Sequence, residues 1–306
     1  MSPRSLIALG LTAALGLGLA GCGDDDASAA DRSLSEFDLV VVASEANDPL
    51  AADLYGIILD PLTAVRITTD KKISAVAATA DQVVVAAADG RVDQLAFVSV
   101  TGELSEIPGL GRPFAYNPSF ADGHTLMFDD VLVPEEGVEV NRTMTWDVDA
   151  KAKNVLFQTT DTLIGSTPGP DGQVALIRTR KKGESIVVRD AAGATKEIAV
   201  EGDVGKLTWG PRYIAVGLNN TERKKGADPS VALILVDPVG GRQLQLGASQ
   251  PIAWTPDGSK LLVRKTGEGA KSQLAWFDPE QPDALGQIGG INGLVIYSGA
   301  WIRGVS

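Results

Sequence analysis

Apolar and polar positions along this chain follow a unit that recurs six times. The unit is an apolar stretch, a turn that contains Asp, Pro or Gly, and a second apolar stretch. Its clearest copy is Leu-Val-Asp-Pro-Val-Gly-Gly-Arg-Gln-Leu-Gln-Leu at 235–246, and related copies lie at 59–67, 98–104, 146–149, 188–193 and 276–279. Asp caps a reversal, Pro fixes φ and Gly supplies positive φ, so the pattern predicts six β-hairpins.

A second unit, apolar on both sides of an Asp-Gly turn, precedes five of these hairpins. Clear copies lie at 119–128, 168–177 and 253–263, and degraded copies at 79–83 and 209–213. Measured between Asp81, Asp122, Asp171, Pro211 and Asp257, the spacings are 41, 49, 40 and 46 residues. Four strands with three turns fit this period, which is typical of the blades of a β-propeller.

The two ends of the repeat are complementary. The first hairpin has a single apolar stretch before it, 37–43, and lacks the strand that should come earlier. After the sixth hairpin one unpaired stretch remains, Leu294 to Ile302. We therefore predict an all-β, six-bladed β-propeller over 36–306, in which the C-terminal strand closes the first blade and removes an open edge. A seven-bladed ring with a truncated last blade and a pair of stacked sheets are the alternatives.

The turns Trp254-Thr255-Pro256-Asp257-Gly258 and Pro170-Asp171-Gly172 resemble β-propeller repeats of the TolB type, which are WD-like repeats found in diverse bacterial proteins. The resemblance covers nearly all of 37–303, although 210–212 lacks the Asp-Gly. It implies the fold and leaves the function open, because function resides in the site rather than in the fold.

The N-terminal segment predicts export and lipid attachment. Arg4 precedes an apolar run at 6–20, which is shorter than the roughly 20 residues of a spanning helix and typical of a secretory signal. The run ends in Leu19-Ala20-Gly21-Cys22, which contains the only cysteine and resembles the lipobox of bacterial lipoproteins. The resemblance implies a signal peptide at 1–21 and acylation of Cys22, with palmitate-type chains holding the protein to the membrane. A buried N-terminal helix with an incidental cysteine is the alternative.

Residues 22–35 follow as an acylated cysteine and a flexible tether, since Gly23 to Ser35 has almost nothing to bury. Its Asp24-Asp25-Asp26 run is better explained as a solvated spacer than as a calcium site, which needs ligands spread over a shaped turn. We expect a location at the cell membrane or outer membrane, on the extracytoplasmic side. The net charge of −12 excludes a nucleic-acid footprint, which would be strongly basic.

Catalytic chemistry is not visible in the sequence. The single histidine, His124, follows an Asp-Gly turn, which argues against a Ser-His-Asp hydrolase and a Cys/His zinc site. In Asp129-Asp130 and Glu135-Glu136, neighbouring strand residues point to opposite faces and do not converge. We predict no catalytic residue, no metal ligand and no cofactor, with a structural calcium ion in the channel left open.

The five tryptophans offer a carbohydrate-stacking interpretation and a structural one. Trp209 and Trp254 occupy the same repeat position, which favours packing between blades, and the same argument applies to Trp146 and Trp276. Trp301 is expected in the closing strand.

The connections between the second and third strands of each blade should emerge on one rim. Their charges predict that one half of this rim is acidic and the other basic. The acidic half comes from the acidic residues at positions 45, 48 and 53 in blade 1 and at 135, 136 and 139 in blade 3. The basic half, on blades 4 to 6, is our candidate binding surface and consists of Arg178, Arg180, Lys181, Lys182, Arg223, Lys224, Lys225, Arg264, Lys265 and Lys271. Ordinary solvated loop charge is the alternative.

These features favour a monomeric, membrane-anchored lipoprotein whose propeller is a scaffold for an envelope protein or an anionic envelope polymer, attracted electrostatically. The alternatives are a metal-assisted lactonase- or lyase-like enzyme that uses the channel, and a passive spacer. Acidic or amide side chains converging on the axis would favour the enzyme, whereas small or apolar ones would favour the scaffold.

Overall fold

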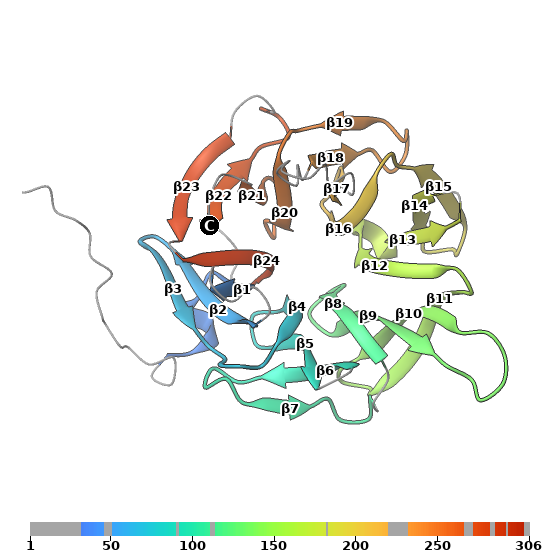
Figure 1. Ribbon diagram of the computed structural model, residues 1–306, viewed down its shortest axis with the longest axis horizontal. Coiled ribbons are helices and arrows are strands. Elements are labelled where there is room, and N and C mark those ends of the chain that lie inside the picture. The colour runs from blue at the N-terminus through green and yellow to red at the C-terminus, as the bar shows by residue number, and fades with distance from the viewer. Residues whose placement is uncertain are drawn as a thin grey trace, which may run out of the picture.

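The computed structural model describes residues 32–45, 51–89, 92–110, 114–181, 183–219, 232–265, 272–281, 285–291 and 293–302. Within these ranges the chain forms six antiparallel sheets of four strands each, arranged as a ring (Figure 1). The predicted six-bladed β-propeller is confirmed, and the seven-bladed and stacked-sheet alternatives are wrong. No helix in the described ranges is both long and apolar enough to cross a membrane.

Each blade has four strands that follow one another from the channel outward. From the innermost strand to the outermost, blade 1 consists of β24 (Leu294–Trp301), β1 (Leu39–Glu45), β2 (Ala52–Leu59) and β3 (Leu62–Arg66). Blade 2 consists of β4 (Ile73–Ala78), β5 (Val83–Asp89), β6 (Val92–Val98) and β7 (Leu104–Glu106). Blade 3 consists of β8 (Phe114–Phe120), β9 (Thr125–Leu132), β10 (Val140–Asp147) and β11 (Ala152–Thr159). Blade 4 consists of β12 (Thr162–Pro168), β13 (Val174–Arg180), β14 (Gly183–Arg189) and β15 (Thr195–Ala199). Blade 5 consists of β16 (Asp203–Trp209), β17 (Ile214–Asn219), β18 (Ala232–Val236) and β19 (Gln243–Gln245). Blade 6 consists of β20 (Ser249–Trp254), β21 (Leu261–Lys265), β22 (Ser272–Phe277) and β23 (Leu285–Ile291). Two short 3-10 turns, η2 (Leu34–Glu36) and η3 (Pro170–Gly172), complete the described elements.

Burial explains the sequence pattern of the strands. The second strand of a blade is covered on both faces by the neighbouring blades, so β1 and β13 read as continuous apolar runs. The outermost strands are the least covered, and β19 is exposed along its whole length. The six predicted hairpin turns join the third and fourth strands of each blade.

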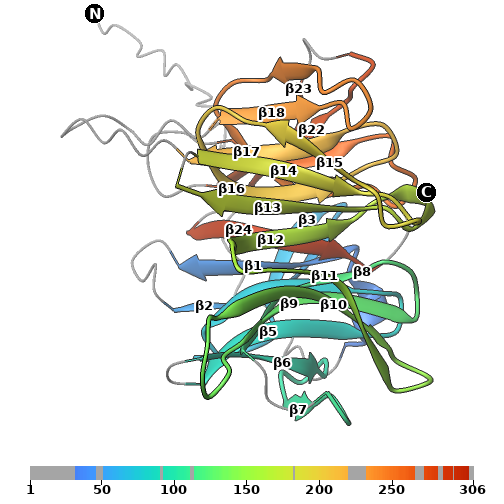
Figure 2. The same ribbon diagram turned by 90° about the vertical axis from the view of Figure 1, so that its right-hand side faces the viewer.

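The ring closes where the sequence predicts. Strand β24 pairs antiparallel with β1, from Leu39 opposite Trp301 to Glu45 opposite Leu294, and the two strands lie side by side in both views (Figures 1 and 2). The indole of Trp301 also stacks on that of Trp276 in blade 6, with ring centroids 5.7 Å apart. The C-terminal strand therefore belongs to blade 1 and contacts blade 6.

Two tryptophans fill the junctions between blades, in agreement with the structural interpretation. The ring of Trp254 lies over Gly210 and that of Trp209 over Gly169, so closely that a Cβ on Gly169 would come within 2.4 Å of the indole. The Trp254 Nε1 donates a hydrogen bond of 3.2 Å to the Thr208 carbonyl of the preceding blade. The glycines are needed here because the aromatic ring occupies the space of their side chains.

Asp53 was expected on the acidic rim, and its side chain is instead fully buried. Its carboxylate accepts hydrogen bonds from Arg66 at 2.5 Å and Thr68 at 2.8 Å, and from the backbone N–H groups of Asp70 and Lys71 at 3.0 Å. Burial raises the pKa of Asp53, but these donors outweigh it and leave the pKa below its usual value. Asp53 therefore fixes the link from blade 1 to blade 2, a partnership across non-adjacent segments that the repeat pattern does not encode.

Candidate functional site in the central channel

Each of the six innermost strands contains an interruption of its register. The irregularities lie between Ile73 and Ala75, Tyr116 and Ser119, Leu163 and Gly165, Val204 and Lys206, Pro251 and Ala253, and opposite Val42 and Ala43 in the pairing of β24 with β1. An extra residue of this kind bends a strand and re-aims its side chains. The bulges therefore form a ring around the channel, and Lys206 directly follows the bulge of β16.

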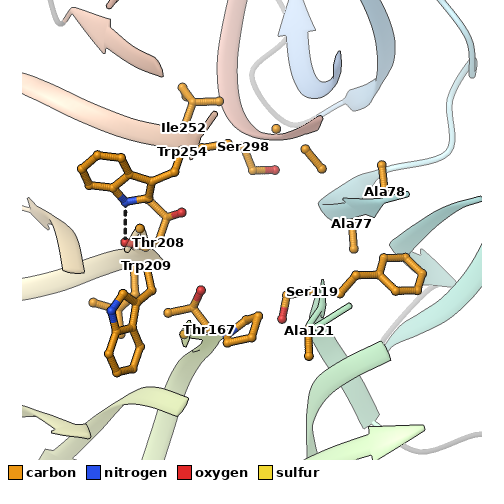
Figure 3. A pocket seen from close by; sticks show the side chains of 18 of the residues that line it. Ala77, Ala78, Ser119, Ala121, Thr167, Thr208, Trp209, Ile252, Trp254 and Ser298 are labelled. Carbon is orange, nitrogen blue, oxygen red and sulfur yellow. Dashed lines mark hydrogen bonds between the residues drawn. The ribbon is translucent and has the colours of Figure 1, made fainter. Parts of the chain in front are cut away.

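A cavity of about 460 Å³ occupies the channel from these bulges to the turns that follow the innermost strands. Most of its lining is small or apolar, including Ala77, Ala121, Thr167, Trp209 and Trp254 (Figure 3). Within the described part of the chain, Lys206 is the one ionisable side chain in that lining. The cavity is therefore lined mainly by small or apolar residues and by a single basic side chain among those described.

Lys206 extends across the junction from blade 5 to blade 6. Its Nζ donates a hydrogen bond of 3.2 Å to the Ile252 carbonyl, at the bulge of β20. Burial, with a smaller contribution from the positive charge of Arg264, lowers the pKa of Lys206 to about 7. Arg264 lies on β21 and donates to the Oε1 of Gln250. Among the ion pairs between described residues, none joins Lys206 or Arg264 to a carboxylate.

The wall between blades 3 and 4 contains a buried acid. Asn117, in the bulge of β8 with φ of 54°, donates to Asp129 at 3.0 Å and to the Ser166 carbonyl at 2.7 Å. Thr143 donates to the other oxygen of Asp129 at 2.8 Å. Burial raises the pKa of Asp129 to about 6, and hydrogen bonds oppose the rise only in part.

Asp130 faces the other side of the same sheet, as strand alternation predicts. Its two oxygens accept hydrogen bonds from Arg142 at 2.7 and 2.6 Å. His124 is exposed on its turn, 3.0 Å from the Asp149 carboxylate. No group of three or more His, Cys, Asp or Glu side chains that could hold a metal ion occurs among the described residues.

Asp129 should make the stability of the protein depend on pH. Because its folded pKa of about 6 lies above the ordinary value of 3.8, the folded protein binds a proton between these values that the unfolded chain does not. The contribution of this group to the free energy of unfolding should rise by about 2 kcal/mol as the pH falls from about 7 to about 4. Urea unfolding across this range should show the rise in the wild type and its loss in Asp129→Asn. Asp171→Asn, at an exposed carboxylate on the turn between β12 and β13, is the control; equal pH slopes in all three proteins would contradict the assignment.

The predicted basic rim is only partly within the described residues. Arg178 and Arg180 both pair with Asp161 and Glu197 on blade 4, with N–O distances of 2.5 Å for Arg178–Glu197 and 3.0 Å for Arg180–Asp161. Lys181 is exposed and Lys265 is half-buried. Lys182, Arg223, Lys224, Lys225 and Lys271 lie outside the described residues, as does Cys22. The rim and the lipidation site stay predictions.

Lys206 is not among the residues predicted from the sequence for a site, and Arg264 is predicted there as a rim charge. The signal available for Lys206 was its place three residues before Trp209, in the repeat position where Pro251 precedes Trp254. A lysine at an otherwise apolar position of an inner strand indicates a special environment. The proximity of this lysine to Arg264 depends on contact between two blades, which no single repeat reveals.

No protein-family model matches this chain, and no curated protein sequence matches it. Solved structures do: TolB from Acinetobacter baumannii superimposes with a TM-score of 0.63 at 18% identity, over 86% of this chain and 66% of the TolB chain. The structure of a putative TolB from Agrobacterium tumefaciens gives 0.58 at 12% identity, over 84% of this chain and 90% of the other. The fold is a TolB-like β-propeller. A chain from the nidogen/laminin complex is also similar, with a TM-score of 0.56 at 14% identity, over 86% of this chain and 97% of the other. At these identities the likeness to TolB and to the other propellers concerns the fold alone, and this chain spans less than two thirds of the length of the Acinetobacter TolB.

Proposed function

We propose that the protein is an exported membrane lipoprotein, anchored through acylated Cys22, whose propeller is a scaffold that binds another protein or an envelope component. The Leu-Ala-Gly-Cys sequence supports the anchor. The TolB-like fold supports the scaffold, since one of the similar propellers was solved in a complex of nidogen with laminin.

The observation that carries the proposal is the exposed hairpin between β9 and β10. Leu132, Val133 and Val138 are 44%, 60% and 65% exposed there, next to the exposed Glu135 and Glu136. Apolar side chains that are exposed together on a surface mark interaction sites, whereas singly scattered ones need no explanation. This hairpin joins the second and third strands of blade 3 and so lies on the rim where the charged connections of the other blades emerge. It fits a partner with an apolar groove edged by positive charge.

The channel lining favours the scaffold over the metal-assisted lactonase- or lyase-like enzyme. Such an enzyme would use acidic or amide groups that converge from several blades. In the described part of the chain the cavity is lined by Asn117 but by no carboxylate, and the amide of Asn117 already donates to Asp129 and Ser166. The rest of the lining consists mainly of small and apolar residues with hydroxyl groups among them.

Crosslinking in intact cells tests the proposed binding hairpin. A variant with Leu132→Ser, Val133→Ser and Val138→Ser should lose a discrete crosslinked product by about tenfold, which corresponds to about 1.4 kcal/mol of binding free energy. The matched control changes three exposed apolar residues elsewhere, Val155→Ser, Val239→Ser and Leu244→Ser. The product should survive in the control. Equal yields from the wild type and the hairpin variant, or loss in the control alone, would contradict the proposal.

A further inference from the structure

Two cationic side chains lie close together at the junction of blades 5 and 6. Lys206 lines the channel cavity, and Arg264 is near enough to act on it electrostatically. Both are bound to uncharged oxygens, the Ile252 carbonyl and the Gln250 side chain, and among the described residues neither forms an ion pair. Both side chains are half-buried, and holding two like charges there without a counter-charge costs free energy, so the arrangement is one that an anion would stabilise.

Hydroxyl groups from other blades line the same cavity as Lys206. The Ser119 hydroxyl of blade 3 and the Ser298 hydroxyl of blade 1 both line the cavity, and each is buried without a hydrogen-bond partner among the described residues. Figure 3 shows both side chains, with Thr167, around the same opening. Buried hydroxyls are normally paired, so each of these has an unused hydrogen bond that rotation of its side chain would direct at an occupant of the cavity.

We propose that the channel binds a small organic carboxylate or phosphate, with its anionic oxygens on Lys206 and the serine hydroxyls and with Arg264 adding attraction. The cavity of about 460 Å³ is in the range of small-molecule sites. Its lining of mainly small side chains leaves room for a ligand of roughly monosaccharide size. Within the described residues, no charged side chain other than Lys206 lines the cavity. The lining of this site shares no residue with the hairpin between β9 and β10.

Binding should be coupled to protonation of Lys206. Among the described residues, the charged and titratable groups that act on it are Arg264 on β21 and, through Arg264, Tyr297 on β24, whose hydroxyl lies 2.8 Å from that of Ser44. The anion selects the charged amine, and the pKa of about 7 makes that form a minor species above neutrality. Affinity should therefore fall about tenfold from about pH 6 to about pH 8.

Isothermal titration of the purified full chain in detergent tests the site. The probes are succinate and glucuronate as carboxylates, and inorganic phosphate and glycerol phosphate as phosphates, at about pH 6 and about pH 8. We expect at least one probe to bind at millimolar concentration or below, more tightly at the lower pH. The set of probes that binds shows which anionic group is preferred. No binding by any of the four would overturn the proposal.

Substitutions separate a role for the charge from a role in folding. Lys206→Met should abolish binding, whereas Lys206→Arg should keep it and remove its pH dependence. Arg264→Met should weaken binding and raise the pKa of Lys206, measured by NMR titration of the amine. Lys260→Met removes an exposed lysine from the β20–β21 turn and is the matched control. Unchanged binding of the anion in Lys206→Met would overturn the proposal. Lys206→Met should leave the crosslinked product of the hairpin unaffected, so the anion site and the binding hairpin are tested independently.

Discussion

Deletion of residues 294–306 should prevent the protein from folding to a stable monomer. The deletion removes β24, which supplies the innermost strand of blade 1 and the Trp301 ring that stacks on Trp276. It would leave β1, whose first six residues are all buried, as an open apolar edge beside the channel. The loss should exceed the net stability of about 5–15 kcal/mol that is typical of folded domains. Thermal unfolding should show no cooperative transition, and size-exclusion chromatography should show aggregates.

Two further variants show whether the effect comes from the strand itself. Deletion of 303–306 alone keeps all of β24 and should leave the melting temperature unchanged. Ile296→Ala keeps the strand but removes a fully buried side chain, and should cost about 2–5 kcal/mol. A soluble monomer with the wild-type melting temperature after deletion of 294–306 would contradict closure by this strand.

Substitution of Cys22 by Ser should release the protein from the membrane. In the proposed lipoprotein the Cys22 thiol carries the acyl chains, and each buried methylene of such a chain contributes about 0.8 kcal/mol to attachment. Serine is nearly isosteric but lacks the thiol. Metabolic labelling with palmitate and fractionation of the cells should show loss of both label and membrane association.

A displaced cysteine is the control for this experiment. Combining Cys22→Ser with Ser28→Cys restores a thiol within the tether but outside the Leu-Ala-Gly-Cys sequence. Neither the label nor the membrane association should return. Full membrane association of the Cys22→Ser protein, or recovery with the displaced thiol, would contradict the lipoprotein assignment.

The six-bladed architecture can be predicted from the sequence because local signals, repeated in each blade, determine where strands and turns lie. Turns such as Asp257-Gly258 and Asp237-Pro238 mark where each chain reversal occurs, and the apolar runs between them have the length of strands. Closure of the ring follows from the number of predicted strands. The stretch 37–43 lacks a preceding partner strand within its repeat, and the stretch 294–302 has no partner after the sixth hairpin. Trp209 and Trp254 were assigned to the blade junctions on the same basis, because equivalent positions in a repeat have equivalent surroundings.

The features that the sequence did not predict are contacts between residues far apart along the chain. Asp53 has the sequence context of a rim charge, but Thr68 and the backbone amides of Asp70 and Lys71 donate hydrogen bonds to its carboxylate. The approach of Lys206 to Arg264 depends on the bulges of β16 and β20 and on the packing of two blades. Such cross-blade geometry follows from strand register, which the composition of a single repeat does not specify.

Hydrogen exchange along β24 tests the central claim most directly, because the channel and the rim both require a closed ring. The amides of β24 that pair with β1 should exchange only through global unfolding, at the rate of the central strands. The amides of the exposed outer strand β19 should exchange faster and report local fraying. Exchange of β24 at the rate of β19, with β1 still protected, would show an open ring and contradict the account.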